Sequence, residues 1–152
     1  MRLITLLLIS VIILSGCANN SSIKGIETST ITDIQKICWQ ETCFKVELAV
    51  TSGERGRGLM YREQLAENSG MLFIFECPDI YPFWMNNTLI PLDIIWLNKQ
   101  RKIVFIKHNA LPCQTNICPN IIPEAPASYV LELNAGVAED IGLKIGDKLV
   151  FK

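Results

Sequence analysis

The sequence predicts a mainly β domain, an antiparallel β-barrel or jelly-roll-like sandwich that carries one or two short helices. About eight short runs rich in β-branched and aromatic residues are separated by turn residues. Strand-like and helix-like segments do not alternate regularly, which argues against a parallel sheet. Residues 70–98 are so rich in Phe, Trp, Met and Ile that they must be buried. A small α+β fold is the alternative, because one segment near the C-terminus has a helical pattern.

Residues 1–16 have the pattern of a secretory signal peptide. Arg2 supplies a positive start, residues 3–14 are mostly apolar, and small residues follow. The end of the segment, Leu14-Ser15-Gly16-Cys17, resembles the lipobox of bacterial lipoproteins, in which the chain is cut before the cysteine and that cysteine is acylated. Cys17 is therefore the predicted lipidation site. An ordinary secretory signal followed by a chance cysteine is the alternative.

Residues 17–34 form the predicted lipidated cysteine and a flexible tether, because residues 18–33 are rich in Asn, Ser and Thr. Two or more acyl chains would anchor the exported protein stably to a membrane. Ala18 rather than Asp follows the cysteine, which resembles outer-membrane sorting. In a Gram-negative cell we expect the protein to be anchored to the periplasmic face of the outer membrane. Residues 35–152 remain as a single β domain.

The composition fits one domain with a core and argues against nucleic acid as a partner. Of 152 residues, 49% are hydrophobic and 19% are charged. The formal net charge is −1 and no basic cluster is present, whereas binding to nucleic acid depends on such clusters. We expect an unknown small molecule or a protein of the cell envelope as the partner.

The cysteines of an exported protein are expected to form disulfides. Cys113 and Cys118 bracket a polar loop between two prolines, and Cys38 and Cys43 bracket a predicted hairpin turn. Structural zinc usually uses C-x2-C spacing and histidines, but these pairs are C-x4-C and the chain has one histidine. Disulfides are therefore favoured over a metal site. Cys77 is left over, and sequence alone does not choose among the possible pairings.

The first elements of the domain are a hairpin and a short helix. Residues 35–39 and 44–50 are the two strands, and apolar side chains alternate with polar ones in the second. Thr51 or Ser52 is the predicted N-cap of a helix over residues 53–61. Glycines at two positions inside it weaken this prediction, and either close packing or a positive φ explains them.

The middle of the domain is predicted to be β-strand. Residues 71–76, 82–87 and 92–97 are three apolar strands separated by turn residues. After a polar turn, residues 102–107 return as the hairpin partner of the third strand. Residues 109–126 are a long, proline-rich loop.

The C-terminal part holds two more strands and the second helix. Residues 128–133 are a strand, and residues 148–151 are the last one. Between them, Asn134 is the predicted cap of a helix over residues 135–141, which Gly142 ends.

Several short phrases, taken together and in this order, resemble one protein family. They are Arg57-Gly58-Leu59-Met60, Gly70-Met71-Leu72-Phe73, Phe83-Trp84-Met85-x-Asn87-Thr88, Pro91-Leu92-Asp93-Ile94-Ile95, Tyr129-Val130-Leu131-Glu132-Leu133-Asn134-Ala135-Gly136 and Gly142-x-x-x-Gly146-Asp147. The chain resembles domain-of-unknown-function family 192, small bacterial and archaeal proteins that are often exported or lipid-anchored. The resemblance implies a mainly β, barrel- or jelly-roll-like domain, and the Cys113/Cys118 pair resembles that of exported members. It implies no established activity, so it transfers no catalytic residue.

Asp93 is the sharpest candidate for a functional side chain. Period two places it on the same strand face as Ile95 and Leu97, so its carboxylate points toward apolar surroundings. A buried carboxylate needs a cation or several N–H donors, and Arg57 is the candidate cation. A structural ion pair or a loop cap is the more common role for such a residue than acid–base chemistry or ligand binding.

Glu132 is the second candidate carboxylate. It shares a strand face with Val130 and Asn134. If it pointed inward together with Asp93, the two carboxylates would share a cleft and could perform hydrolysis. A solvated face is the more common position for a glutamate.

Asn87 and Thr88 stand where a predicted strand ends, beside Trp84. Asn and Thr at such ends often bond to the local backbone. Ligand pockets also combine apolar walls with a few amide or hydroxyl groups, and they tend to lie at loop ends of a rigid β scaffold.

Metal binding is the weakest of the functional predictions. Met60, Met71 and Met85, with His108, would suit copper in an exported protein, because thioether and imidazole groups bind Cu(I). The methionines stand in apolar runs without M-x-M clustering, so packing in the core is the more common role.

We therefore predict a non-catalytic binding or accessory module that needs no cofactor. Motifs for a serine hydrolase, a zinc protease, a phosphate loop and a C-x-x-C oxidoreductase are absent from the sequence. A cell-envelope hydrolase that uses Asp93 and Glu132 is the first alternative, and exported copper binding is the second. The predicted binding residues are Arg57, Trp84, Asn87, Thr88, Asp93 and Glu132.

Overall fold

The computed structural model describes residues 34–113, 115 and 117–152. The predicted signal peptide, the lipidation site Cys17 and most of the tether lie outside these residues. In the described part, no helix is both long and apolar enough to cross a membrane.

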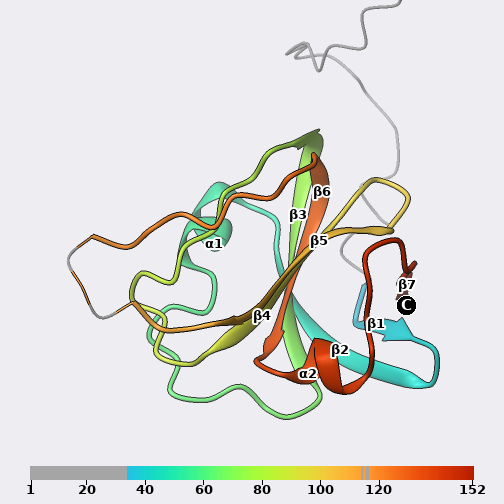
Figure 1. Cartoon of the computed structure of the whole chain (residues 1–152), viewed down its shortest axis with the longest axis horizontal. Coiled ribbons are helices and arrows are strands. Elements are labelled where there is room, and N and C mark those ends of the chain that lie inside the picture. Colours follow the sequence, from blue (N-terminus) through green and yellow to red (C-terminus); the bar gives the residue numbers. More distant parts are fainter. Residues whose placement is uncertain (1–33, 114, 116) are drawn as a thin grey trace, which may run out of the picture.

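Seven strands and two short helices make up the described chain (Figure 1). In chain order they are β1 (Lys36–Trp39), β2 (Thr42–Ala49), α1 (Ser52–Arg57), β3 (Ser69–Asp79), β4 (Leu92–Leu97), β5 (Ile103–Ala110), β6 (Ala127–Asn134), α2 (Val137–Asp140) and β7 (Val150–Phe151). The predicted fold class, mainly β with two short helices, is confirmed.

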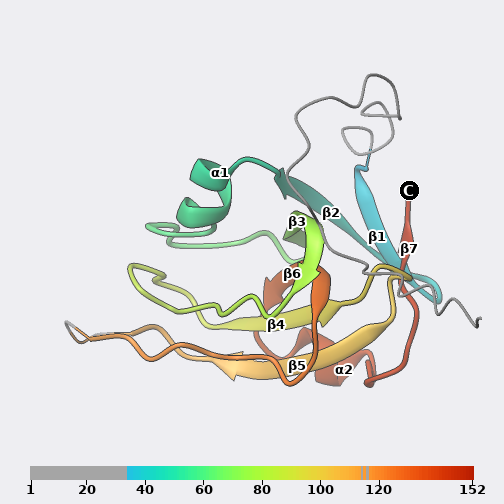
Figure 2. The same cartoon turned by 90° about the horizontal axis from the view of Figure 1, so that it is seen from above.

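The strands form one curled sheet in the order β5-β4-β6-β3-β2-β1-β7. Every pair of neighbours is antiparallel except β2 and β3, which are parallel and connected through α1. The curl brings the chain after α2 back toward β5, as an isolated bridge between Lys102 and Lys148 shows. The sheet is thus a half-barrel, with α1 and α2 on different sides of it (Figure 2).

Each face of the sheet has its own apolar cluster, because side chains of a strand alternate between faces. One face holds Ile95, Leu97, Leu131 and Leu133 and is covered by α2. The other holds Phe73, Met85, Ile94, Trp96 and Val130 and is covered by α1 and the loops that follow it. All six residues of β4 are buried, which explains why residues 92–97 are apolar almost throughout. We call these the α2 face and the α1 face.

Two disulfides occur where the sequence predicts them. Cys38 and Cys43 are directly opposite each other in the β1–β2 hairpin, with their Cα atoms 4.1 Å apart. Cys113 and Cys118 close the loop that follows β5, with a Cα distance of 5.8 Å. Both predicted pairs are confirmed, and they hold short loops rather than distant parts of the sheet.

The prediction of a strand over residues 82–87 is wrong. This segment is a loop that makes one isolated bridge, between Phe83 and Ile121. Pro82 cannot donate a backbone hydrogen bond. The Phe83 ring instead packs edge-on against Phe73 and Trp96, at centroid distances of 4.8 and 5.5 Å, and so fastens the loop to the α1 face.

Both helices are shorter than predicted. Thr51, one of the two predicted N-caps, caps α1 and forms a capping box with Glu54, but the helix ends before Gly58, whose φ is 47° and ψ is −133°. The cap of α2 is Gly136 and not Asn134. Asn134 is the last residue of β6, and its side chain donates to the carbonyls of Leu65 and Ala66.

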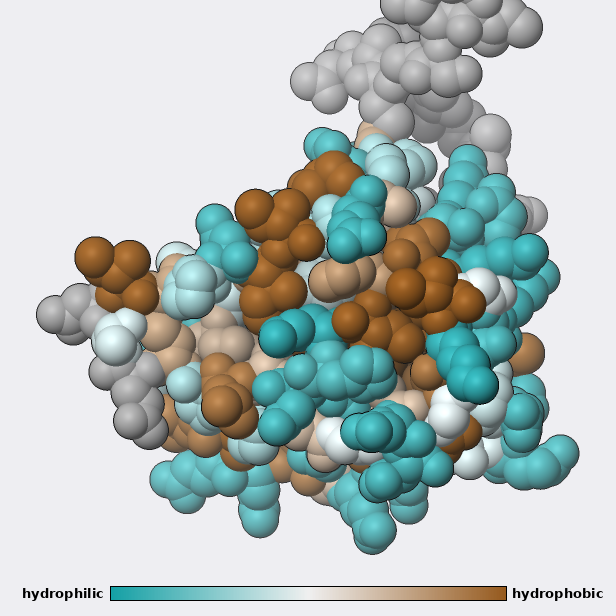
Figure 3. Space-filling view, viewed as in Figure 1, coloured by the Kyte–Doolittle hydropathy of each residue, from teal (hydrophilic) through white to brown (hydrophobic). Residues whose placement is uncertain are grey.

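Apolar side chains also remain on the surface, where Figure 3 shows them as separate patches divided by polar residues. Most of the large ones belong to the loops before and after β4 and β5 and to the segment before β6. These residues include Trp84, Leu89, Leu111, Ile117 and Ile122, and Tyr61 is exposed in the loop between α1 and β3.

Candidate functional site

Glu132 lies in the middle of the sheet and is buried. β6 lies between β4 and β3, and Glu132 is paired with Ile94 on one side and Met71 on the other. Its side chain points to the α1 face, and the residue is only 5% exposed. The expectation that Glu132 stands on a solvated face is therefore wrong, because α1 and the loop after β3 cover this part of the sheet.

The Glu132 carboxyl is incompletely satisfied. Its Oε2 atom is buried and has no hydrogen-bond partner among the described residues. Burial raises the pKa of this carboxyl to about 8, because the charged form loses its hydration. At neutral pH the group is therefore mainly a neutral acid that can donate a hydrogen bond.

A cavity of about 30 Å³ lies beside this carboxyl. Its polar lining residues are Glu132, Thr88, Arg55 and Arg57, and its walls are Gly56, Gly58, Leu59, Met60, Phe73, Phe83 and Trp84. A space of this size holds a small polar group or one to two water molecules. Four of the six predicted binding residues (Arg57, Trp84, Thr88 and Glu132) thus meet at one place.

Gly58 is the residue that brings the end of α1 so close to the carboxyl. A Cβ atom at this position would lie 3.2 Å from Cζ of Phe73 and 4.0 Å from Oε2 of Glu132. Its φ of 47° is also one that side chains disfavour. The sequence offered two explanations for a glycine here, close packing and a positive φ, and both apply.

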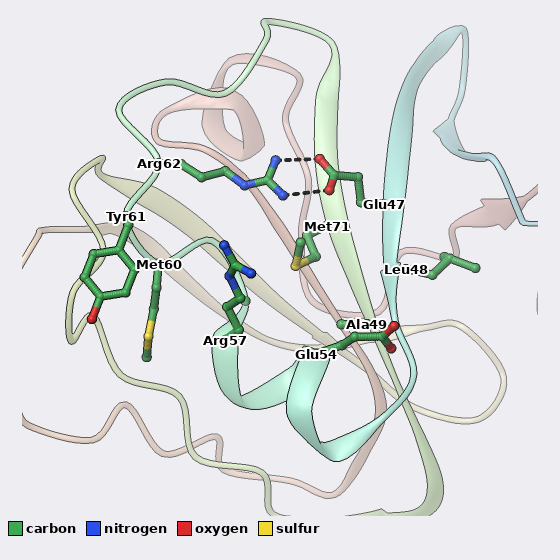
Figure 4. Close-up of a pocket in the computed structure, with 10 residues that line it drawn as sticks. Glu47, Leu48, Ala49, Glu54, Arg57, Met60, Tyr61, Arg62 and Met71 are labelled. Carbon is green, nitrogen blue, oxygen red and sulfur yellow. Dashed lines mark hydrogen bonds and ion pairs between the residues drawn. The ribbon is translucent and has the colours of Figure 1, made fainter.

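A larger pocket of about 430 Å³ shares Arg57, Gly58 and Met60 with this cavity (Figure 4). Arg62 forms two hydrogen bonds with Glu47, at 2.5 and 2.6 Å, which lower the pKa of Glu47 and raise that of Arg62. Glu54 is occupied by the capping box. Arg57 extends from α1 into this pocket and makes no ion pair with any residue that the structure describes. Its charge is therefore available to a ligand.

An aromatic cleft of about 260 Å³ adjoins the cavity on its other side. Phe75 and Tyr81 stack there, with centroids 3.6 Å apart. Arg55 lies over Phe75 and donates to the carbonyls of Val50 and Ile74, so this arginine serves the fold. Trp84 lines both the cleft and the cavity and is 48% exposed.

Asp93 lies on the α2 face, away from this site. Its two carboxylate oxygens accept hydrogen bonds from the backbone N–H groups of Asn109 and Ala138, each at 2.8 Å. The second bond caps the first turn of α2. The predicted ion pair with Arg57 is wrong, and the capping role that the sequence offered as the alternative is the one observed.

The two carboxylates therefore do not share a cleft. Asp93 is opposite Leu133 in the β4–β6 register, and Glu132 is opposite Ile94. Side chains in such pairs point to the same face, and successive pairs point to opposite faces. The paired-carboxylate arrangement on which the hydrolase alternative depends is thus not present.

Asn87 is close to the site but does not line the cavity. It has a φ of 55°, and its carbonyl accepts a hydrogen bond from the N–H of Tyr61 at 2.8 Å. Thr88, the next residue, is buried and faces the cavity. Its hydroxyl makes no hydrogen bond with a described residue. Asn87 thus connects two loops, and Thr88 is the member of the pair that can meet a ligand.

Comparison with protein-family models matches residues 34–151 to DUF192, whose description is "Uncharacterized ACR". This chain belongs to the DUF192 family. A search among curated proteins found no match.

Two solved structures are similar to this DUF192 protein. A protein of unknown function from Novosphingobium aromaticivorans DSM 12444 is 33% identical, with a TM-score of 0.71 over 89% of this chain and 99% of that one. A protein from Sinorhizobium meliloti 1021, provisionally named a transcription regulator, is 39% identical, with a TM-score of 0.65 over 72% of this chain and 82% of that one. Both likenesses are consistent with the family assignment.

Two of the three methionines considered for copper binding pack in the core, which is the role that the sequence favours. Met71 and Met85 are buried in the apolar cluster of the α1 face, and His108 is exposed on β5. Within the described residues, no three His, Cys, Asp or Glu side chains come close enough to hold a metal ion.

Sequence reasoning missed the apolar walls of the site. Phe73 and Phe83 belong to the aromatic stretch that the sequence assigned to the core, and nothing distinguishes a core phenylalanine from one beside a cavity. Gly58 did carry a signal, since a glycine inside a predicted helix indicates a special backbone position.

Proposed function

We propose that this DUF192 protein is a non-catalytic binding module whose ligand enters the cavity above Glu132. The observation that supports the proposal most strongly is Oε2 of Glu132, a buried carboxyl oxygen without a hydrogen-bond partner among the described residues. Buried polar groups are almost always hydrogen-bonded, so an exception at a cavity points to a missing ligand or water. The unpaired Arg57, the Thr88 hydroxyl and the half-exposed Trp84 supply further groups for recognition.

Binding is favoured over catalysis by the chemistry of the lining residues. They include one carboxyl, one hydroxyl and two guanidinium groups, but neither histidine nor cysteine. Glu132 is not hydrogen-bonded to Thr88, so no nucleophile and base are paired there. A single protonated carboxyl with a nearby cation is a means of holding a polar group in place.

The proposal includes the location of the protein. The sequence of residues 1–17 supports export and acylation of Cys17, and the two disulfides fit an oxidising compartment. The module would then work from the membrane of the cell envelope, on the periplasmic face of the outer membrane in a Gram-negative cell. Regulation of transcription, the role in the name of the Sinorhizobium relative, would need a basic surface, and the formal net charge here is −1.

An NMR fragment screen of the full chain in detergent tests the binding site. We expect the fragments that bind to shift the signals of the Gly58 and Thr88 amides and the Trp84 indole. Trp84→Ala should weaken their binding, whereas Leu89→Ala, which removes another exposed apolar side chain from the same loop, should not. Binding of all fragments elsewhere on the surface would contradict the proposed site.

Metabolic labelling with a radioactive fatty acid tests the anchor. Label should enter the native protein and be lost from Cys17→Ser, which should also leave the membrane fraction. A Cys17→Ser protein that still carries label and sediments with membranes would show that the anchor is misplaced.

A further inference from the structure

We infer that the ligand is a small carboxylic acid, with its carboxylate in the cavity beside Glu132 and an apolar or aromatic body in the cleft lined by Phe75, Tyr81 and Trp84. The inference rests on the proposed function, because it names the ligand of the same site. It follows from the chemistry of the residues around the cavity, from its size and from the cleft that adjoins it.

The residues that line the cavity beside Glu132 carry positive charge or none. From α1 come Arg55 and Arg57, and from the loop after β3 come Thr88 and Trp84. The flanking strands β3 and β4 contribute apolar neighbours, Met71 and Ile94. Burial alone, with no contribution from a neighbouring charge, raises the pKa of Glu132, so the carboxyl is mainly protonated at neutral pH and the cavity has two possible O–H donors.

A carboxylate complements this arrangement. One of its oxygens can accept from the Glu132 carboxyl, the other from Thr88, and the guanidinium of Arg57 can supply the countercharge. Arg57 is the suitable arginine, because Arg55 already donates to two backbone carbonyls whereas Arg57 is not paired with a described residue.

An amine fits less well. It would require the ionised form of Glu132, which about one molecule in ten has at pH 7 if the pKa is about 8. It would also be placed next to Arg57, with repulsion between like charges. A cation–π contact with Trp84 is the one feature that would favour it.

The dimensions limit the ligand to a small one. The cavity of about 30 Å³ accommodates a carboxylate but not a ring. The cleft of about 260 Å³ shares Arg55, Gly56, Phe83 and Trp84 with the cavity, so the two spaces adjoin, and the inferred ligand spans both. Sites for drug-sized ligands are usually larger, about 300–1,000 Å³.

A matched pair of probes, 3-phenylpropionate and 3-phenylpropylamine, tests the inference in NMR titrations of the full chain in detergent. The acid should bind at pH 6.5 and shift the amide signals of Gly58 and Thr88. Its affinity should fall about tenfold by pH 9, because most Glu132 carboxyls are then ionised while the probe does not change its charge.

Two variants separate the roles of the charged groups. Glu132→Gln preserves a neutral donor, so it should still bind the acid, and the affinity should no longer fall with pH. Arg57→Ala should lower the affinity for the acid roughly fivefold, since the lost bond involves a solvent-exposed cation. Arg101→Ala removes an arginine that stacks on Phe151 and does not line the cavity, and it is the matched control.

The results distinguish failure of the inference from failure of the proposed function. The amine could instead bind better than the acid, with an affinity that rises with pH and with no binding to Glu132→Gln. The pocket is then a binding site, but its ligand is a cation. If other fragments occupy the cavity and neither probe does, the inference fails alone. If no compound shifts the signals around Gly58 and Thr88, both fail.

The same titration identifies the source of the carboxylate. A short peptide that ends in phenylalanine represents a protein chain end, and 3-phenylpropionate represents a free acid. Preference for the peptide over its C-terminally amidated form, with weaker binding of the free acid, would assign the site to a protein partner. Preference for the free acid would assign it to a small metabolite.

Discussion

The two faces of the central sheet each bury one carboxyl group, and they treat it in opposite ways. On the α2 face, both oxygens of Asp93 accept backbone hydrogen bonds. On the α1 face, Oε2 of Glu132 has no partner in the described part of the chain and lies beside a cavity. A satisfied buried carboxylate stabilises a fold, whereas an unsatisfied one reduces stability and is retained for another reason. The contrast is the reason why we propose that Glu132, and not Asp93, meets a ligand.

The largest expected effect concerns pH. The pKa of Glu132 rises from its ordinary value of 4.5 in the unfolded chain to about 8 in the folded one. The unfolded chain therefore loses its proton first, and the free energy of unfolding should fall as the pH rises from 4.5 to 8, by on the order of 4 kcal/mol. Glu132→Gln should remove this fall, so urea unfolding should show it to be more stable than the native protein at pH 8.

The comparison with pH 5 is the control for that experiment. There the carboxyl is neutral in the folded state and about three-quarters ionised in the unfolded state, so its burial has cost less than about 1 kcal/mol and the two proteins should differ much less than at pH 8. The free energy of unfolding of the native protein should fall more steeply between pH 5 and pH 8 than that of Glu132→Gln. If the two fall equally, Glu132 is not a protonated buried acid.

Loss of Asp93 should destabilise the protein by roughly 3 kcal/mol, because Asp93→Ala leaves two backbone N–H groups without an acceptor. The measurement is the free energy of unfolding in urea at pH 7. Binding at the cavity should persist in the folded fraction. A folded Asp93→Ala protein that had lost binding would break the contrast between the two faces.

Gly58→Ala should cost about 2 kcal/mol, from the positive φ and from the approach of the new methyl group to Phe73. Gly56→Ala is the matched control, because Gly56 lies two residues earlier, inside α1, with nothing within 4 Å of a Cβ atom. That substitution should stabilise α1 by up to about 1 kcal/mol. Equal effects of the two changes in thermal unfolding would mean that Gly58 does not shape the cavity.

The smallest effect belongs to the ion pair at the edge of the larger pocket. Arg62→Ala should lower the free energy of unfolding by less than about 1 kcal/mol, because the pair is partly exposed to solvent. The change should appear in the titration of Glu47. Its pKa, which the hydrogen bonds from Arg62 now lower, should return toward the ordinary value. An unchanged Glu47 titration would show that the pair does not persist in solution.

Much of the fold could be predicted because its signals are local. The alternation in residues 44–50, the turn between Cys38 and Cys43 and the apolar run of residues 92–97 each report on one strand and its neighbours in sequence. Thr51 and Glu54 form the capping box that their spacing allows. The error over residues 82–87 arose because an apolar, aromatic segment can form a strand or cover one, and local pattern does not distinguish the two.

The sequence by itself determined that the protein has a mainly β domain, that Cys38 and Cys43 can close a hairpin, and that polar residues stand within its apolar stretches. Only the tertiary structure decided which of those polar residues meet. The alternation of side chains along a strand gives the face of β4 on which Asp93 lies and the face of β6 on which Glu132 lies. It does not give the register between β4 and β6, because β5 and a long loop separate these two strands in the sequence. A shift of that register by one residue would place the two carboxyls on the same face of the sheet.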